Sequence, residues 1–231
     1  MTDARERLER LIELAGESTP EKQRALAFEL CDLLVDWPGR YPAAMREPFE
    51  ALLEKVLRRL DGATRRMIAA RLATHPETAV TLLNEFYLDM PAEIRMGILA
   101  RNANSTDAVA EEAESVDDAP LIDAARHARG SELAATFAQF LGVPATTARR
   151  ILDDSSGNAL AVACKGAHVR RATFSALALL TLPDVRANPS VRYLRLSAFD
   201  EIPQSGADTM LDFWRRARTD DAGLAADEEA A

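Results

Sequence analysis

Apolar side chains recur at the spacing of an α-helix along almost the whole chain. The clearest stripe, with intervals of three and four residues, consists of Phe49, Leu52, Leu53, Val56, Leu57 and Leu60. A helix with such a stripe buries one face and exposes the other. Thr19-Pro20-Glu21 is a signal for a helix start, and the residues WPGRYP at 37–42 end that helix. We therefore predict an all-α protein of roughly a dozen short helices.

One short phrase occurs three times in the chain. It reads IAARLATHPETAV from Ile68, ILARNANSTDAVA from Ile98 and AARHARGSELAA from Ala124. Each copy combines a helix end, a polar turn and a new helix start, with an arginine in the last turn, where a cation is favourable. Repeated helix pairs bury their apolar faces on their neighbours. We expect stacked antiparallel helix pairs arranged in two helical lobes.

The distribution of acidic residues divides the chain. Residues 104–120 (NSTDAVAEEAESVDDAP) are acidic and poor in large apolar side chains. They predict either an exposed helix or, as we favour, a boundary segment between an N-terminal helical-repeat lobe at 1–103 and a C-terminal helical lobe at 121–218. The acidic tail at 219–231 has little to bury and is predicted to be disordered.

Residues 137–152, FAQFLGVPATTARRIL, have the pattern of a helix-turn-helix. Ala138, Gly142 and Ile151 stand where that motif needs a small residue, a turn and an apolar anchor. The same pattern returns 24 residues later, where Gly142 corresponds to Gly166. We expect two hairpins with glycine turns in the C-terminal lobe. A motif that repeats in tandem favours a structural unit over a dedicated DNA reader.

The arginines of these two hairpins are the candidate contacts with a partner or with DNA: Arg149, Arg150, Arg170 and Arg171. In the alternative hypothesis, the chain is a transcription regulator that reads DNA through residues 133–152. The predicted reading helix opens with Pro144 and Ala145, which cannot donate side-chain hydrogen bonds to bases. Binding to nucleic acid is therefore disfavoured, although it stays open.

Overall composition narrows the compartment and the classes of partner. Acidic residues outnumber basic ones by 37 to 28, and the net charge of −9 opposes binding to a phosphate backbone. The two cysteines, Cys31 and Cys164, form neither a disulfide framework nor a zinc pattern. The chain shows no secretory signal and no apolar run of membrane-spanning length. We expect a soluble cytoplasmic protein that does not contact a membrane.

The sequence predicts no catalytic, cofactor or metal site. Cys164 and His168 are four residues apart, but Gly166 between them predicts a helix end, so thiol and imidazole need not share a face. The stretch DDSSGNAL at 153–160 lacks the spacing of a phosphate loop, and its Ser and Asn residues are interpreted as helix caps. An enzyme centred on Cys164 is a third, weaker hypothesis.

Other polar and aromatic residues receive ordinary structural interpretations. The paired carboxylates at 111–112 and 117–118 lie in polar surroundings, so we expect them to be solvated charges. Aromatic residues next to loops or in the last helix could anchor a partner, but a core role is favoured for them; they are Trp37, Tyr41, Tyr193 and Trp214.

Several phrases of the sequence resemble a known family. The helix followed by STPEKQRAL, the helix RRMIAARLA and the late phrase SGNALAVACKGA are similar to a family of uncharacterised, mainly alphaproteobacterial proteins built from HEAT-like helical repeats. The resemblance implies an α-solenoid and supplies no catalytic residues. Together with the residue patterns, it leads us to expect a non-enzymatic cytoplasmic helical-repeat module, without a cofactor, that mediates protein–protein interaction with a regulatory role.

Overall fold

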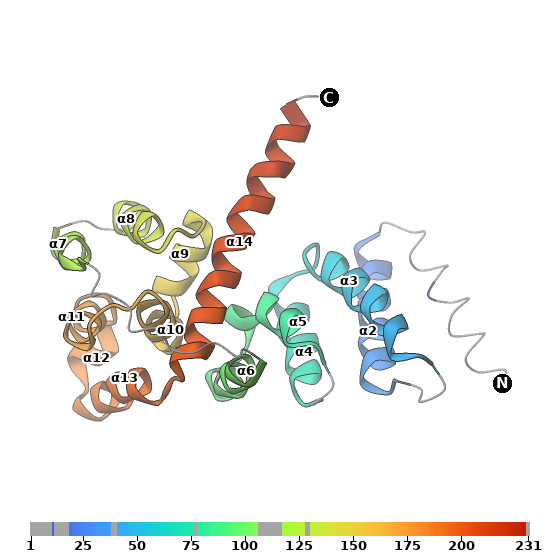
Figure 1. Ribbon diagram of the computed structural model, residues 1–231, viewed down its shortest axis with the longest axis horizontal. Helices are drawn as coiled ribbons and strands as arrows, with labels where there is room; N and C mark the ends of the chain where they lie inside the picture. The colour runs from blue at the N-terminus through green and yellow to red at the C-terminus, as the bar shows by residue number, and fades with distance from the viewer. Residues whose placement is uncertain are drawn as a thin grey trace. The chain divides into compact units, whose positions relative to one another are not determined.

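The structure, a computed structural model, describes residues 11, 19–37, 41–75, 78–105, 117–127 and 130–229 (Figure 1). Helices form the regular structure of these residues, which contain no strand, so the predicted all-α class is confirmed. The chain divides into two compact units, residues 1–98 and residues 99–231. Within the described ranges, no helix combines the length and apolarity needed to cross a membrane.

The first unit consists of short helices. They are α2 (Pro20–Val35), the single turn η1 (Ala43–Met45), α3 (Arg46–Leu57), α4 (Gly62–Ala73), α5 (Val80–Glu85), the single turn η2 (Tyr87–Asp89) and the first part of α6 (Ala92–Ser105). Both α2 and α5 pack against α3 and α4. α2 begins at the predicted Pro20, and α3 contains most of the predicted apolar stripe, with Leu53, Val56 and Leu57 buried. The helical periodicity therefore identified the buried face of α3.

The second unit contains the remaining helices. They are α7 (Ala119–His127), α8 (Ser131–Leu141), α9 (Ala145–Leu152), α10 (Asn158–Gly166), α11 (Arg171–Thr181), α12 (Pro183–Ala187), α13 (Pro189–Glu201) and α14 (Gln204–Glu229). Consecutive helices from α7 to α13 pack on one another, and α14, red in Figure 1, packs against α10. Of the nine residues of α10, only Lys165 is not buried. α10 is therefore the central helix of this unit.

Arginine side chains close the C-terminal ends of several helices. The last carbonyl groups of a helix have no partner inside it, and a cation there also interacts favourably with the helix dipole. Guanidinium groups donate hydrogen bonds from Arg46 to the Leu34 carbonyl (3.0 Å), from Arg95 to the Met90 carbonyl (2.9 Å) and from Arg215 to the Leu141 carbonyl (2.9 Å). Some of the arginines therefore stabilise the fold by capping the ends of helices.

Two predicted segment boundaries can be compared with the structure. The two compact units divide between Ile98 and Leu99, inside α6, whereas the acidic pattern places a boundary at 104–120. Residues 106–116 of that segment lie outside the described residues.

α14 continues to Glu229, into the tail for which the sequence predicts disorder. Ala, Leu and Glu favour helix, and extending an existing helix adds a backbone hydrogen bond for each residue.

The three recurring phrases each coincide with the end of a helix. α4 ends at Ala73, α6 at Ser105 and α7 at His127, in each case after the arginine that the phrases share. A helix thus ends at each recurring phrase, as the prediction of repeated helix pairs requires. The α-solenoid arrangement itself stays a prediction.

Candidate functional site

The predicted helix-turn-helix is formed by α8 and α9. Gly142 follows α8 with a φ of 72°, in the left-handed region that glycine adopts without a steric penalty. The backbone N–H groups of Gly142 and Val143 both donate to the Ala138 carbonyl, at 2.9 and 3.1 Å. Ala148 and Ile151 of α9 are buried. Sequence reasoning therefore located both the turn and the apolar anchor of this hairpin.

The second hairpin, formed by α10 and α11, corrects the predicted alignment of Gly142 with Gly166. Its left-handed residue is His168, with a φ of 54°, and the Val169 N–H donates to the Cys164 carbonyl at 2.9 Å. This bond matches the one from Val143 to Ala138, so the two hairpins are related by a shift of 26 residues instead of 24. The sequence hides this relation because histidine occupies the position that glycine takes in the first hairpin.

Gly166 has a different role from the predicted turn. It is the last residue of α10, and a Cβ atom added there would lie 2.5 Å from the Ala207 carbonyl oxygen of α14. The residue before Ala207 is Gly206, which likewise approaches the Leu99 carbonyl too closely for a Cβ atom. Glycine at 166 therefore permits the close packing of α10 against α14, which we call the α10–α14 contact.

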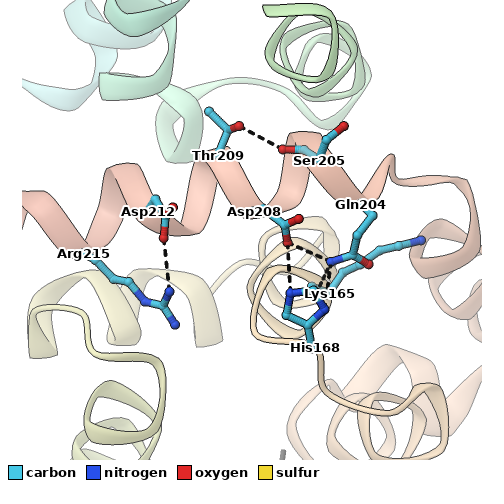
Figure 2. Close-up of polar contacts among 8 residues, drawn as sticks. All are labelled: Lys165, His168, Gln204, Ser205, Asp208, Thr209, Asp212 and Arg215. Carbon is cyan, nitrogen blue, oxygen red and sulfur yellow. Dashed lines mark hydrogen bonds and ion pairs between the residues drawn. The ribbon is translucent and has the colours of Figure 1, made fainter. Parts of the chain in front are cut away.

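Polar side chains surround the α10–α14 contact (Figure 2). Gln204 Nε2 donates to the Lys165 carbonyl and to Asp208 Oδ1, both at 2.8 Å, and Lys165 Nζ donates to the Phe199 carbonyl at 2.8 Å. Burial lowers the pKa of Lys165. Further along α14, Arg215 donates to Asp212 at 3.1 Å and also to the Leu141 carbonyl. α14 therefore holds the C-terminal ends of both α8 and α10.

His168 lies at the edge of this network. Its Nε2 is 3.6 Å from Asp208 Oδ1, and its Nδ1 is 3.5 Å from Gln204 Nε2. The weaker hypothesis of an enzyme centred on Cys164 would need this imidazole or another base beside a reactive thiol. Cys164 is fully buried, and burial raises the pKa of its thiol far above the ordinary value, which disfavours the reactive thiolate. The geometry thus supports a core role for Cys164.

The stretch DDSSGNAL caps α10. Asp154 Oδ2 accepts from the Ala159 N–H (3.0 Å) and from Ser156 Oγ (2.6 Å), and Ser156 Oγ accepts from the Asn158 N–H (3.1 Å). A carboxylate at a helix N-terminus is stabilised by the free N–H groups and by the helix dipole. The capping interpretation is therefore confirmed for Ser156, whereas the main acceptor is Asp154 and Asn158 Oδ1 accepts no hydrogen bond from the described residues. Across the described parts of the chain, no three His, Cys, Asp or Glu residues are grouped so that they could hold a metal ion.

Two of the four candidate contact arginines are engaged inside the second unit. Arg170 binds Asp118 through its backbone N–H (3.3 Å), its Nε (3.1 Å) and its Nη2. Asp118 is fully buried, which corrects its interpretation as a solvated charge. Hydrogen bonds from Arg170 lower the pKa of Asp118 from 3.8 to about 2. Arg171 binds Asp200 with two bonds of 2.7 Å. Both guanidinium groups thus already have carboxylate partners.

The other two candidate arginines lie on the exposed side of α9. Arg149 Nε is 3.4 Å from Asp153, in a pair whose side chains are more than half exposed. Arg150 is exposed as well, next to Thr146 on the same helix. These two residues point away from the core residues Ala148 and Ile151. They remain candidate contacts.

An exposed apolar surface on the second unit was missed by the sequence analysis. Tyr193 is 78% exposed and Leu194 is 66% exposed, and Leu180 at the end of α11 is 37% exposed. The expectation of a core role for Tyr193 is wrong, although Trp214 is buried as expected. The signal in the sequence is that apolar residues occur all round α13, although only Phe199 is buried.

Comparison with known proteins identifies the family of the chain. The family model described as uncharacterised protein conserved in bacteria (DUF2336) matches residues 44–212, which include both hairpins and the exposed residues of α13. No curated protein matches the sequence, and no solved structure does. The match covers well over half of the chain. The chain therefore belongs to the DUF2336 family of bacterial proteins.

Proposed function

We propose that this chain is a non-enzymatic module that binds a protein partner, with a regulatory role, through an exposed apolar surface. The surface consists of Leu180, Tyr193 and Leu194, and we call it the α13 surface. The observation that carries the proposal is the exposure of Tyr193 (78%) and Leu194 (66%) side by side on one helix. Monomeric proteins seldom leave large neighbouring apolar side chains uncovered, and such patches commonly bind partners.

The residue types of the α13 surface suit protein binding. Tyrosine is enriched among the residues that dominate interface energies, because its ring buries a large area and its hydroxyl can still form a hydrogen bond. Burying an exposed leucine side chain contributes roughly 1.5–3 kcal/mol. Covering Tyr193 and Leu194 together would therefore provide a substantial part of the free energy of a specific complex.

Two further features belong to this proposal. The helix pairs are proposed to stack as a HEAT-like α-solenoid, which is supported by the packing of consecutive helices from α7 to α13. The protein is proposed to act in the bacterial cytoplasm. Its cysteines, Cys31 and Cys164, are both buried and free, which suits a reducing compartment.

Affinity enrichment from bacterial lysate tests the proposed function. The bait is the full chain, either unchanged or with Tyr193→Asp and Leu194→Asp, and proteins are quantified by mass spectrometry. We expect the unchanged chain to enrich a partner that the double variant loses. Met67→Asp is the matched control, because Met67 is 58% exposed in the other unit. Equal enrichment by all three baits would contradict the proposal.

A second candidate function is supported by the first hairpin. Residues 133–152 include a helix-turn-helix geometry with a left-handed Gly142, and α9 exposes Arg149 and Arg150. On this proposal the chain is a transcription regulator that binds DNA with these two arginines. Binding to DNA should then be salt-dependent and should be lost when both arginines are changed to Ala. Absence of retention on DNA at about 50 mM salt, where phosphate contacts are strong, would reject it.

A further inference from the structure

Two arginines lie beside the α13 surface and join its parts together. Arg186 of α12 donates to the Leu179 carbonyl (3.4 Å) and the Leu180 carbonyl (3.3 Å) at the end of α11. Arg192 of α13, next to Tyr193, donates to the Val185 carbonyl (3.0 Å) and the Arg186 carbonyl (3.1 Å). These bonds join the end of α11 to α12 and the end of α12 to α13, so the chain segments that carry Leu180 and Tyr193 are held together.

The positive charges of Arg186 and Arg192 are not matched by carboxylates. Both guanidinium groups bond only to backbone carbonyls, which are neutral, and within the described residues neither forms an ion pair. Arg170 and Arg171 are different, since Asp118 and Asp200 neutralise them. The positive charge beside the α13 surface is therefore not neutralised by an ion pair with any residue that the structure describes, unlike that of Arg170 and Arg171.

Arg186 and Arg192 each keep unused N–H donors, and their bonds to carbonyls fix the direction in which these donors point. In both Arg186 and Arg192 the bonds use Nε and Nη2, so Nη1 keeps its two N–H groups for an external acceptor. A guanidinium that is already held in place loses less conformational entropy when it binds a carboxylate. The two side chains are thus pre-positioned to form charge-assisted hydrogen bonds.

We propose that the α13 surface binds an acidic, amphipathic segment of a partner protein, in which carboxylates flank apolar residues. This inference rests on the proposed function. The apolar residues of the segment pack on Leu180, Tyr193 and Leu194, while its carboxylates bind Nη1 of Arg186 and Arg192. The whole chain has a net charge of −9, so its overall field repels acidic segments. Charge complementarity between Arg186, Arg192 and the carboxylates of the segment therefore favours an acidic partner at this surface.

Selection from a random peptide library displayed on phage tests this inference with the full chain as target. Parallel selections use the unchanged chain, Tyr193→Ala, and the double variant Arg186→Gln with Arg192→Gln. Arg126→Gln is the control, because it removes an equal charge from an exposed position on α7. Each variant is first compared with the unchanged chain by circular dichroism, since Arg186 and Arg192 also cap helices.

We expect peptides selected by the unchanged chain to be enriched in Asp and Glu next to apolar residues. Their affinity should fall about thirtyfold with Tyr193→Ala and about two- to fivefold for each arginine changed to Gln, and it should be unaffected by Arg126→Gln. Binding to the unchanged chain should weaken as salt is added, which tests the charge contribution even if the double variant is unstable.

Other outcomes separate failure of the inference from failure of the proposed function. Peptides that depend on Tyr193 but are basic or show no charge preference would overturn the inference and leave the proposed function standing. If no selected peptide depends on Tyr193, both are overturned. Self-association in sedimentation velocity that Tyr193→Ala abolishes would show that a second copy of this chain covers the surface, and would also overturn the inference.

Discussion

The α10–α14 contact and the α13 surface lie in the same unit, but they differ in whether their apolar and polar groups are covered by other parts of the chain. At the α10–α14 contact, Gly166 permits the approach of two helices and Gln204 meets the carbonyl at the end of α10. At the α13 surface, Tyr193 and Leu194 remain uncovered and Arg186 lacks a carboxylate. The groups at the α10–α14 contact pack and form hydrogen bonds within the chain, whereas the α13 surface leaves apolar side chains exposed to a partner. The exposed residues of the α13 surface therefore indicate where the proposed partner binds, which the number of arginines in the sequence does not.

At the α10–α14 contact, filling the space at Gly166 should cause a large loss of stability. In Gly166→Ala, the new Cβ atom would lie 2.5 Å from the Ala207 carbonyl oxygen and 3.0 Å from Leu211 Cβ, so the helices must move apart. We expect the free energy of unfolding to fall by about 2–3 kcal/mol, measured by urea denaturation. Gly97→Ala is the control: nothing lies within 4 Å of its added Cβ, so stability should rise by up to about 1 kcal/mol. Similar results for both variants would contradict a close α10–α14 contact.

The buried carboxylate of Asp118 should make stability depend on acid pH. Its pKa is lowered from 3.8 to about 2 in the folded chain, so its ionised form stabilises the fold above pH 3.8. This contribution should be lost as the pH falls from about 4 toward 2. Asp118→Asn should remove that part of the pH dependence, measured as the thermal midpoint against pH. Asp184→Asn changes an exposed carboxylate and should leave the profile unchanged. Identical profiles for the unchanged chain and Asp118→Asn would refute the assigned role.

The two hairpin turns should differ in how much stability a substitution costs. Gly142→Ala places a Cβ atom at a φ of 72° and should reduce the free energy of unfolding by about 1 kcal/mol. His168→Gly removes a Cβ atom from a φ of 54°, so it should change stability by less than about 1 kcal/mol even though Gln204 and Asp208 lose a neighbour. Thermal denaturation of both variants measures this. A larger loss for His168→Gly than for Gly142→Ala would show that the histidine contacts matter more than backbone strain.

The smallest effect on stability is expected at the α13 surface. Tyr193→Ala and Leu194→Ala remove side chains that are 78% and 66% exposed, so each should change the free energy of unfolding by no more than about 0.5 kcal/mol. Phe199→Ala on the same helix is the contrasting variant, since Phe199 is 8% exposed and stacks on Phe174 at 4.8 Å; it should cost about 3 kcal/mol. A strong destabilisation by Tyr193→Ala would mean that this residue serves the fold.

Local patterns in the sequence predicted much of the fold but little of the candidate site. The stripe of α3, the start at Pro20 and the turn at Gly142 depend on neighbouring residues, and periodicity and turn chemistry reveal such features. The role of Gly166 depends on Ala207, which is 41 residues away, and the burial of Asp118 depends on Arg170, 52 residues away. Contacts over such separations leave no local pattern, and the exposure of Tyr193 depends equally on which helices happen to cover α13.

Site-specific photo-crosslinking tests the central claim most directly. A photoreactive amino acid is placed at Tyr193 in one form of the full chain and at Thr146, on the exposed side of α9, in another, and both are irradiated in bacterial lysate. We predict that Tyr193 forms a crosslink to a protein, that Leu194→Asp abolishes this crosslink, and that position 146 gives none. A crosslink from position 146 to protein or DNA, together with no crosslink from position 193, would contradict the account.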